Sequence, residues 1–170
     1  RRMPHLMLHG KRIVVVMPAY KAGRTLKATW RDLPHDIVDE VIVVDDKSDD
    51  DTVAVAESLG IPVILHPHNK GYGGNQKTCY AQALERGADI VVMVHPDYQY
   101  DPRMVTAMAG MVATGIYDMV IGSRILGRRE PGALLPQARA GNLVACAMIR
   151  LLYGHRFTDL GPFRAIRWEA

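Results

Sequence analysis

The stretch "MVHPDYQYDP" (93–102) ends an apolar run with a histidine, a proline and an aspartate. A carboxylate oxygen suits Mg²⁺ and Mn²⁺, whereas a neutral imidazole tolerates Mn²⁺ better than Mg²⁺. His95 and Asp97 lie two positions apart, and Pro96 between them fixes its own φ and restricts the residue before it. Asp97 is therefore a candidate metal ligand. His95 is either a second ligand or a turn residue that only forms hydrogen bonds.

Two adjacent carboxylates end another apolar run. In "VIVVDDKSDDDT" (41–52), Asp45 and Asp46 directly follow four apolar residues. An acid in this position can accept hydrogen bonds from a base N–H or from ribose hydroxyls. The acids at 49–51 are instead typical of a helix N-cap and first turn. Asp45 and Asp46 are therefore candidates for contact with a nucleoside.

The segment "HNKGYGGNQK" (68–77) places three glycines just before a helical pattern. Glycines let a backbone approach a ligand, and the N-terminus of a helix offers unpaired N–H groups to an anion. Gly71 and Lys77 are candidates for such an anion site, although a plain turn with a helix cap explains the glycines about as well. His66 and His68 could be metal ligands, but we favour ordinary residues at the end of a strand.

Five apolar runs alternate with helical patterns. We expect strands over 12–20, 38–46, 61–67, 89–95 and 117–123. We expect helices over 23–33, 50–60, 73–87, 101–115 and 137–154. This alternation predicts an α/β fold with a mostly parallel sheet flanked by helices. Four of the predicted strands deliver polar groups to their carboxyl ends, which is the edge where open α/β sheets bind ligands.

Composition and charge narrow the function classes. The net charge is +3 and the pI is about 9.0, which is too mildly basic for a nucleic-acid binder. The basic residues gather in "SRILGRR" (123–129), which suits a phosphorylated ligand. The turn after the first strand, "PAYKAGR", lacks the glycine fingerprint of dinucleotide-binding folds, and no P-loop is present. No apolar run approaches the roughly 20 residues needed to cross a bilayer, so we expect a cytoplasmic protein.

Taken in order, five motifs resemble those of the family-two inverting glycosyltransferases. They are "VVVMPAYKAGRTL", "VIVVDDKSDDDT", "HNKGYGGNQKTCYAQALERGAD", "VVMVHPDYQYDP" and "DMVIGSRILG". The likeness is greatest to dolichyl-phosphate mannose synthase and the polyprenyl-phosphate glycosyltransferases. It is clear over 12–126 and weaker over 140–168, where "FTDLGPFRAIR" is shorter than the family's segment by one residue.

The resemblance implies a GT-A fold, the Rossmann-like fold of nucleotide-diphospho-sugar transferases, and a role for each matching residue. His95 stands where the family has the first acid of its DxD motif, and Asp97 matches the second. The implied catalytic residues are Asp97, Arg124 and Asp159, and the implied metal ligands are Asp97 and His95. The implied substrate-binding residues are Pro18, Ala19, Tyr20, Asp45, Asp46, Gly71, Lys77, His95, Gln99, Ser123 and Arg164.

The expected reaction transfers a sugar from a nucleotide-diphosphate sugar to a polyprenyl phosphate, with Mg²⁺ or Mn²⁺. A phosphate acceptor is anionic near neutral pH, so it needs a positive clamp such as Arg124, Arg128 or Arg129, not a general base. We expect one domain over 1–170, shortened on its acceptor side, with peripheral contact at the cytoplasmic face of a membrane. The alternatives are a catalytically impaired nucleotide-sugar-binding module and a nucleotidyltransferase. The nucleotidyltransferase alternative conflicts with the absence of a Gly-rich basic loop after the first strand.

Overall fold

The computed structural model describes residues 8–123, 136–154, 156–161 and 163–168. Within these ranges six strands form one sheet in the order β3-β2-β1-β4-β6-β5. The strands are β1 (Ile13–Ala19), β2 (Glu40–Asp45), β3 (Val63–Leu65), β4 (Ile90–Met93), β5 (Met119–Ile121) and β6 (Arg164–Arg167). Strands β1 to β4 are parallel, whereas β6 is antiparallel to both β4 and β5. The predicted mostly parallel α/β sheet is confirmed.

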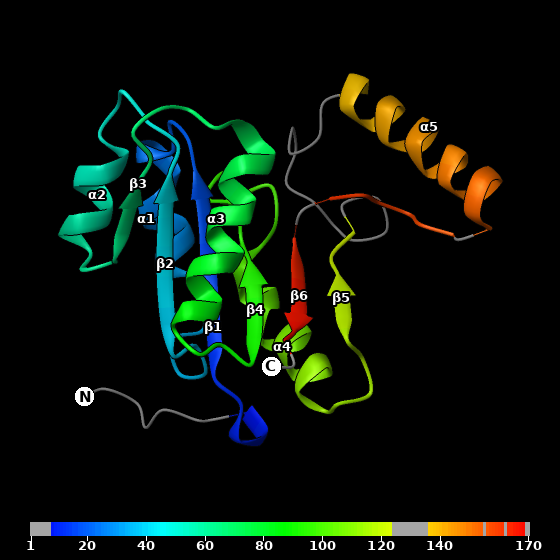
Figure 1. Ribbon diagram of the computed structural model, residues 1–170, viewed down its shortest axis with the longest axis horizontal. Coiled ribbons are helices and arrows are strands. Elements are labelled where there is room, and N and C mark those ends of the chain that lie inside the picture. Colours follow the sequence, from blue (N-terminus) through cyan, green and yellow to red (C-terminus); the bar gives the residue numbers. More distant parts are fainter. Residues whose placement is uncertain (1–7, 124–135, 155, 162, 169–170) are drawn as a thin grey trace.

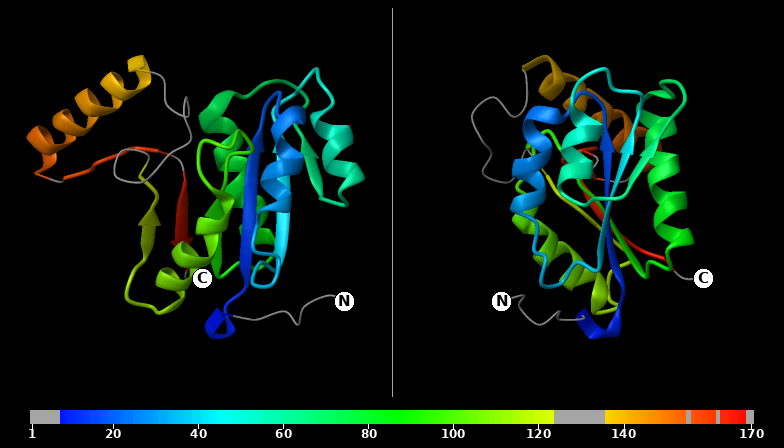
Figure 2. Two further views of the ribbon diagram at one scale, coloured as in Figure 1. Left: turned by 180° about the vertical axis from the view of Figure 1, so that it is seen from behind. Right: turned by 90° about the vertical axis from the view of Figure 1, so that its left-hand side faces the viewer.

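Helices cover both faces of this sheet. The helices in the described ranges are α1 (Gly23–Arg31), α2 (Thr52–Ser58), α3 (Gly71–Glu85), α4 (Val105–Ala113) and α5 (Pro136–Tyr153), with short 3₁₀ turns η1 (Leu8–Gly10) and η2 (Pro102–Met104). Helix α3 covers one face of the sheet, and α1, α2 and α4 cover the other (Figures 1 and 2). The predicted helix over 101–115 is thus divided between η2 and α4.

The β-branched run of β1 explains why this strand lies at the centre of the core. All seven of its residues are buried, and alternate side chains point to opposite faces of the sheet. Val14 and Val16 pack with Cys79 and Ala83 of α3. Val15 belongs to the other apolar cluster, with residues of α1 and α4. A strand that is buried on both faces is apolar throughout its length, and only its ends can carry polar function.

Strand β6 brings the end of the chain into the sheet between β4 and β5. Arg164 pairs with Met93 on one side and with Ile121 on the other. Because β6 runs against its neighbours, its first residue lies at the edge where the parallel strands end. The sequence predicted no strand here, although it placed Arg164 near a ligand.

Helix α5 lies apart from the layers that cover the sheet (Figure 1). Its Asn142 side chain donates to the Thr158 carbonyl oxygen and accepts from the Leu160 backbone N–H, at 3.3 and 2.9 Å. Several of its large apolar side chains are exposed, and Leu151 is 85% exposed. None of the helices in the described ranges is long and apolar enough to span a membrane.

Candidate active site

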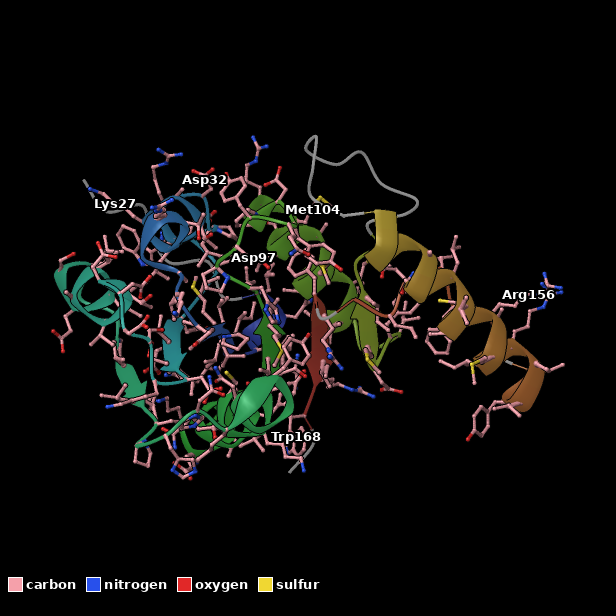
Figure 3. The ribbon with its side chains drawn as sticks, turned by 90° about the horizontal axis from the view of Figure 1, so that it is seen from above. Lys27, Asp32, Asp97, Met104, Arg156 and Trp168 are labelled. Carbon is pink, nitrogen blue, oxygen red and sulfur yellow. The ribbon has the colours of Figure 1, made fainter. Side chains whose placement is uncertain are left out.

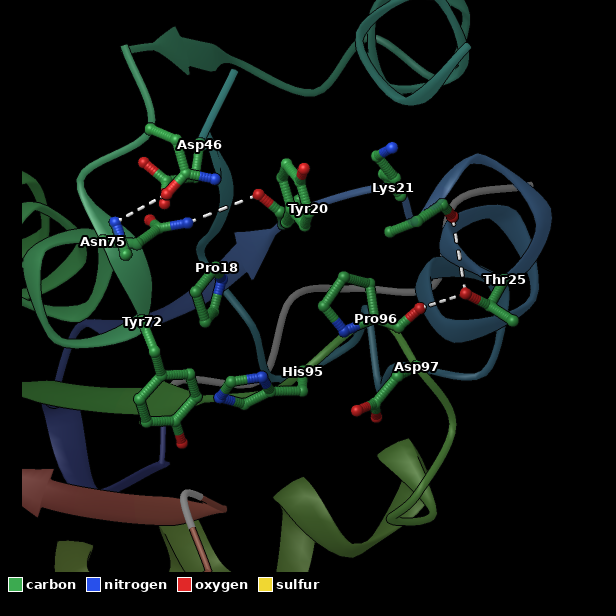
Figure 4. A pocket seen from close by; sticks show the side chains of 14 residues that line it. Pro18, Tyr20, Lys21, Thr25, Asp46, Tyr72, Asn75, His95, Pro96 and Asp97 are labelled. Carbon is green, nitrogen blue, oxygen red and sulfur yellow. Dashed lines mark hydrogen bonds between the residues drawn. The ribbon is translucent and has the colours of Figure 1, made fainter. Parts of the chain in front are cut away.

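A pocket of about 330 Å³ opens at the carboxyl ends of β1 and β4 and beside the start of α3 (Figure 4). Its lining residues come from four segments of the chain. They are Pro18, Ala19, Tyr20, Lys21, Ala22, Thr25, Asp46, Asn69, Gly71, Tyr72, Asn75, His95, Pro96 and Asp97. Seven of the predicted site residues therefore line a single cavity: Pro18, Ala19, Tyr20, Asp46, Gly71, His95 and Asp97.

The turns that follow the strands take an uncommon backbone conformation. Lys21, Lys47 and Tyr98 have φ values of 53°, 63° and 59°, and they follow β1, β2 and β4 respectively. Residues other than glycine seldom adopt positive φ, and such positions gather at functional sites. Lys21 lines the pocket, and Lys47 and Tyr98 each directly follow a residue that lines it.

Asp46 is the acid of the pair that lines the pocket. It is 3% exposed, and its Oδ1 accepts hydrogen bonds from His66 Nδ1 and from the Lys70 backbone N–H, both at 2.8 Å. Burial alone would raise the pKa of Asp46. The hydrogen bonds from His66, Lys70 and the Gly71 backbone outweigh burial and lower that pKa below its usual value. Asp46 is therefore an ionised acceptor.

Asp45 is fully buried and lies outside the residues that line the pocket. Its Oδ2 accepts a hydrogen bond from the Ser48 backbone N–H at 2.8 Å, whereas its Oδ1 is buried with no hydrogen-bond partner among the described residues. Adjacent residues at the end of a strand point to opposite sides, which separates the two acids. The structure thus assigns the pocket-lining position to Asp46 and a turn-forming contact to Asp45.

Asn75 is a buried pocket residue that sequence reasoning missed. Its amide nitrogen donates to the Ala19 carbonyl oxygen at 3.3 Å and to the Val44 carbonyl oxygen at 3.1 Å. These contacts tie α3 to the ends of β1 and β2. The available signal was an amide among the apolar positions of the predicted helix 73–87.

His95 and Asp97 both line the pocket, but their surroundings differ. The His95 ring stacks on Tyr72, with ring centroids 5.4 Å apart and an angle of 25° between the planes. Asp97 is exposed, and its Oδ1 accepts a hydrogen bond from the Gln99 backbone N–H at 3.0 Å. Seen from above the strand ends, Asp97 lies over the middle of the molecule, far from Arg156 beyond the end of α5 (Figure 3).

The donor atoms at this edge fit a Mg²⁺ or Mn²⁺ ion that takes its other ligands from phosphates and water. The described part of the chain contains no group of three His, Cys, Asp or Glu residues able to hold a metal alone. Mg²⁺ in phosphate-binding sites commonly uses one or two carboxylates together with substrate oxygens. The exposed carboxylate of Asp97 is such a donor, and the His95 imidazole lines the same pocket.

The other predicted residues lie outside this pocket. Lys77 is exposed on α3, and Gln99 follows Asp97 in the same loop. Ser123 Oγ accepts from the Thr158 hydroxyl at 3.3 Å, and Arg164 Nη2 donates to Gln76 Oε1 at 3.5 Å. Asp159 is buried, with its Oδ2 3.5 Å from the Tyr100 hydroxyl. Arg124, Arg128 and Arg129 lie outside the described residues.

Two relatives found by comparison with known sequences are named as sugar transferases that act on a lipid phosphate. The chain is 29% identical over 166 residues to a UDP-N-acetylglucosamine–dolichyl-phosphate N-acetylglucosaminyltransferase of Methanococcus voltae, covering 88% of this chain and 66% of that protein. It is 31% identical over 172 residues to an undecaprenyl-phosphate mannosyltransferase of Micrococcus luteus, covering 92% and 66%. The chain thus spans slightly less than two thirds of the length of these proteins.

Among solved structures, the chain is similar to glucosyl-3-phosphoglycerate synthase from Mycobacterium tuberculosis in complex with Mn²⁺, UDP-glucose and phosphoglyceric acid. The TM-score is 0.71 at 25% identity, over 93% of this chain and 57% of that one. The same enzyme in complex with Mg²⁺ and UDP matches with the same score, identity and coverage. These likenesses confirm the predicted GT-A type of fold. The profile of "Glycosyl transferase family 2" matches residues 14–167, and the chain therefore belongs to glycosyl transferase family 2.

Proposed function

We propose that this chain is an inverting glycosyltransferase domain that moves a sugar from a nucleotide-diphosphate sugar to a polyprenyl phosphate, with a divalent cation. The observation that carries the proposal is the one pocket that gathers Asp46 from the end of β2, Gly71 from the start of α3, and His95 and Asp97 from the end of β4. In open α/β sheets this edge binds the ligand. In the reaction, the bond between the anomeric carbon and the diphosphate breaks as an acceptor phosphate oxygen attacks from the opposite face.

The nucleoside end of the donor belongs beside Asp46 and the turn of residues 18–20. The Asp46 carboxylate accepts hydrogen bonds only, so it selects a base or ribose group that donates. Tyr20 is 53% exposed at the pocket, where its ring can lie against a base. Gly71, with φ of 74°, lets the backbone turn close to the ligand at the start of α3.

The diphosphate end of the donor belongs near Asp97. Asp97 and His95 would hold the cation, which when bound offsets the negative charge that develops on the departing diphosphate. Asp97 supplies a hard oxygen ligand, and Pro96 keeps it close to His95 in the turn after β4. The hydrogen bond from the Gln99 backbone fixes one oxygen of Asp97, which limits rotation of the carboxylate.

A phosphate-bearing acceptor is supported by what the names of the relatives and the ligands of a solved neighbour have in common. The names of two relatives specify dolichyl or undecaprenyl phosphate, and the solved neighbour is bound to phosphoglyceric acid. All of these molecules carry an anionic phosphate that a cationic side chain can bind, and in a polyprenyl phosphate this phosphate is itself the nucleophile and needs no general base. Arg164, at the start of β6, is a cationic side chain at the same edge of the sheet. We propose that Arg164 and Arg124 bind the acceptor anion, that Asp159 shapes this region, and that the enzyme works at the cytoplasmic face of a membrane.

A transfer assay tests this function. The protein is incubated with labelled UDP-glucose, UDP-N-acetylglucosamine or GDP-mannose, with Mn²⁺, Mg²⁺ or EDTA. Parallel reactions contain undecaprenyl phosphate or 3-phosphoglycerate. We expect label in the organic phase with undecaprenyl phosphate, and none with EDTA. Transfer to 3-phosphoglycerate alone would replace the lipid acceptor with a soluble one. Donor binding without transfer would indicate an impaired binding module. Conversion of the nucleotide sugar and added pyrophosphate to a nucleoside triphosphate and a sugar phosphate would indicate a nucleotidyltransferase.

A further inference from the structure

A buried chain of hydrogen bonds lies behind the pocket. His66 Nδ1 is 2.8 Å from Asp46 Oδ1, and His66 Nε2 is 2.9 Å from the Thr78 hydroxyl oxygen. The side chains of His66 and Asp46 are only 3% and 4% exposed. His66 does not line the pocket itself, so any influence that it has on a ligand passes through Asp46.

The donors and acceptors in this chain fit together in one orientation of the His66 ring. The ionised carboxylate of Asp46 only accepts, so Nδ1 of His66 carries a proton. The Thr78 hydroxyl both donates and accepts, and its oxygen also lies 3.3 Å from the Gly74 carbonyl oxygen. Nε2 is therefore satisfied whether or not it carries a proton. Both ring nitrogens are held, and the imidazole cannot turn without losing a buried hydrogen bond.

This arrangement fixes the carboxylate at the junction of three segments. Asp46 follows β2, His66 follows β3, and Lys70 immediately precedes α3. The hydrogen bonds from His66 and from the Lys70 backbone both end on Oδ1 of Asp46, and Oδ2 takes part in neither. A carboxylate that is anchored through one oxygen presents the other in a fixed direction.

We propose that His66 is a positioning residue, which orients the Asp46 carboxylate so that it accepts hydrogen bonds from the nucleoside part of the donor. The inference rests on the proposed function, because it concerns the same nucleotide pocket. It assigns a role to a histidine that the sequence presented as an ordinary residue at a strand end. It also predicts that, when His66 is replaced, nucleotide affinity depends more on where the new side chain places its donating nitrogen than on the size of that side chain.

Two substitutions separate positioning from packing. In His66→Asn the amide nitrogen lies close to the place of Nδ1, so it can still donate to Asp46. In His66→Gln the longer amide reaches toward the place of Nε2 and Thr78, and it loses the contact with Asp46. Binding of UDP and of GDP, each with Mn²⁺, is measured by calorimetry for the parent and both variants. Thermal unfolding of each variant provides a check on folding.

We expect His66→Asn to bind nucleotide within about threefold of the parent, and His66→Gln to bind at least about tenfold more weakly, as for loss of a hydrogen bond to a charged group. In the Asp46→Ala background the two substitutions should be equivalent, because the group that His66 positions is gone. Equal affinities of the Asn and Gln variants, or tighter binding by Gln, would overturn the positioning role while the nucleotide site stands. Absence of nucleotide binding by the parent would overturn the proposed function and, with it, this inference.

Discussion

The Thr25 hydroxyl donates a hydrogen bond to the Pro96 carbonyl oxygen, and this contact joins α1 to the loop that carries Asp97 (Figure 4). A second contact supports the same loop, since the Tyr98 hydroxyl donates to Asp32 just after α1. Tyr98 has a φ of 59°, a backbone conformation that costs free energy and persists only where surrounding contacts offset that cost. The position of Asp97 therefore depends on α1, although the two are about seventy residues apart in the sequence.

Removing the Thr25 hydroxyl should loosen this loop. We expect Thr25→Val to lower the free energy of unfolding by about 1 kcal/mol and to weaken Mn²⁺-dependent binding of a nucleotide sugar about three- to tenfold. Thr25→Ser keeps the hydroxyl and should behave like the parent. Urea unfolding and calorimetric titration of the three proteins provide the comparison. Equal donor affinity in Thr25→Val and Thr25→Ser would show that the loop does not need this anchor.

The two pocket residues on either side of Pro96 have separable roles in metal binding. Asp97→Ala should abolish metal-dependent donor binding and turnover, because it removes the hard oxygen ligand. His95→Asp supplies a second carboxylate and should retain activity with a preference shifted toward Mg²⁺. Titrations of donor binding with Mn²⁺ and with Mg²⁺ distinguish these outcomes.

Each of the two variants tests the assignment of its own residue as a metal ligand. Full metal-dependent binding in Asp97→Ala would place the metal site elsewhere. An unchanged metal preference in His95→Asp would mean that His95 is not a ligand. Asp36→Ala is the matched control, because it also removes an exposed carboxylate and Asp36 lies outside the pocket lining.

The sequence predicts the parts of the site that depend on local pattern. The apolar runs of β1 and β4 are long enough to be recognised as buried strands, and polar residues follow each of them directly. The shared edge then follows from parallel topology. That is why seven predicted residues meet in one pocket without any knowledge of tertiary contacts.

The missing parts of the site depend on contacts between distant residues. Asn75 reaches Val44, and His66 reaches Asp46, across gaps of 31 and 20 positions. No local pattern records such pairings. Strand β6 is only four residues long, with arginines at both ends, and it becomes a strand by pairing with β4 about seventy-five residues earlier. Local propensity alone does not specify it.

Acid stability should report the environment of Asp46. Its pKa is lower in the folded protein than the ordinary value of about 3.9, so its contribution to stability is complete above that value. This contribution is lost as the pH falls below about 4 and through the folded pKa. We expect the free energy of unfolding of Asp46→Asn to fall less steeply than that of the parent over this range. Urea unfolding at several pH values tests this, with the exposed Asp36→Asn as the control for net charge.

The exposed face of α5 should contact a lipid surface. Its exposed apolar side chains are Leu143, Val144, Met148, Leu151 and Leu152. Arg150 and Arg156 lie beside them and are exposed, which favours anionic headgroups. We expect flotation with vesicles that contain phosphatidylglycerol, weakened by salt and by the double substitution Leu151→Ser/Leu152→Ser. Binding that is absent, or that is equal in this variant, would contradict a membrane role for α5.

Gly161 is needed because the chain passes very close to Tyr100 and Asp159. A Cβ atom at Gly161 would lie 1.7 Å from the Tyr100 hydroxyl oxygen and 3.3 Å from Asp159 Oδ1. Gly161→Ala must therefore push the Tyr100 side chain aside and break its contact with the buried Asp159. Overpacking of this kind costs about 1–3 kcal/mol in unfolding free energy. If Asp159 shapes the acceptor region, Gly161→Ala should also reduce transfer to polyprenyl phosphate while leaving nucleotide binding unchanged.

The double variant Gly161→Ala/Tyr100→Phe supplies the internal control for this prediction. Removing the Tyr100 hydroxyl relieves the shortest contact, so the double variant should regain part of the stability that Gly161→Ala loses. It should not regain transfer, because the phenylalanine ring cannot donate to Asp159. Measuring unfolding free energy, nucleotide affinity and transfer rate for Gly161→Ala, Tyr100→Phe and the double variant separates steric strain from the loss of the hydrogen bond. Full transfer activity in both Tyr100→Phe and the double variant would show that the Tyr100–Asp159 contact plays no part in the acceptor region.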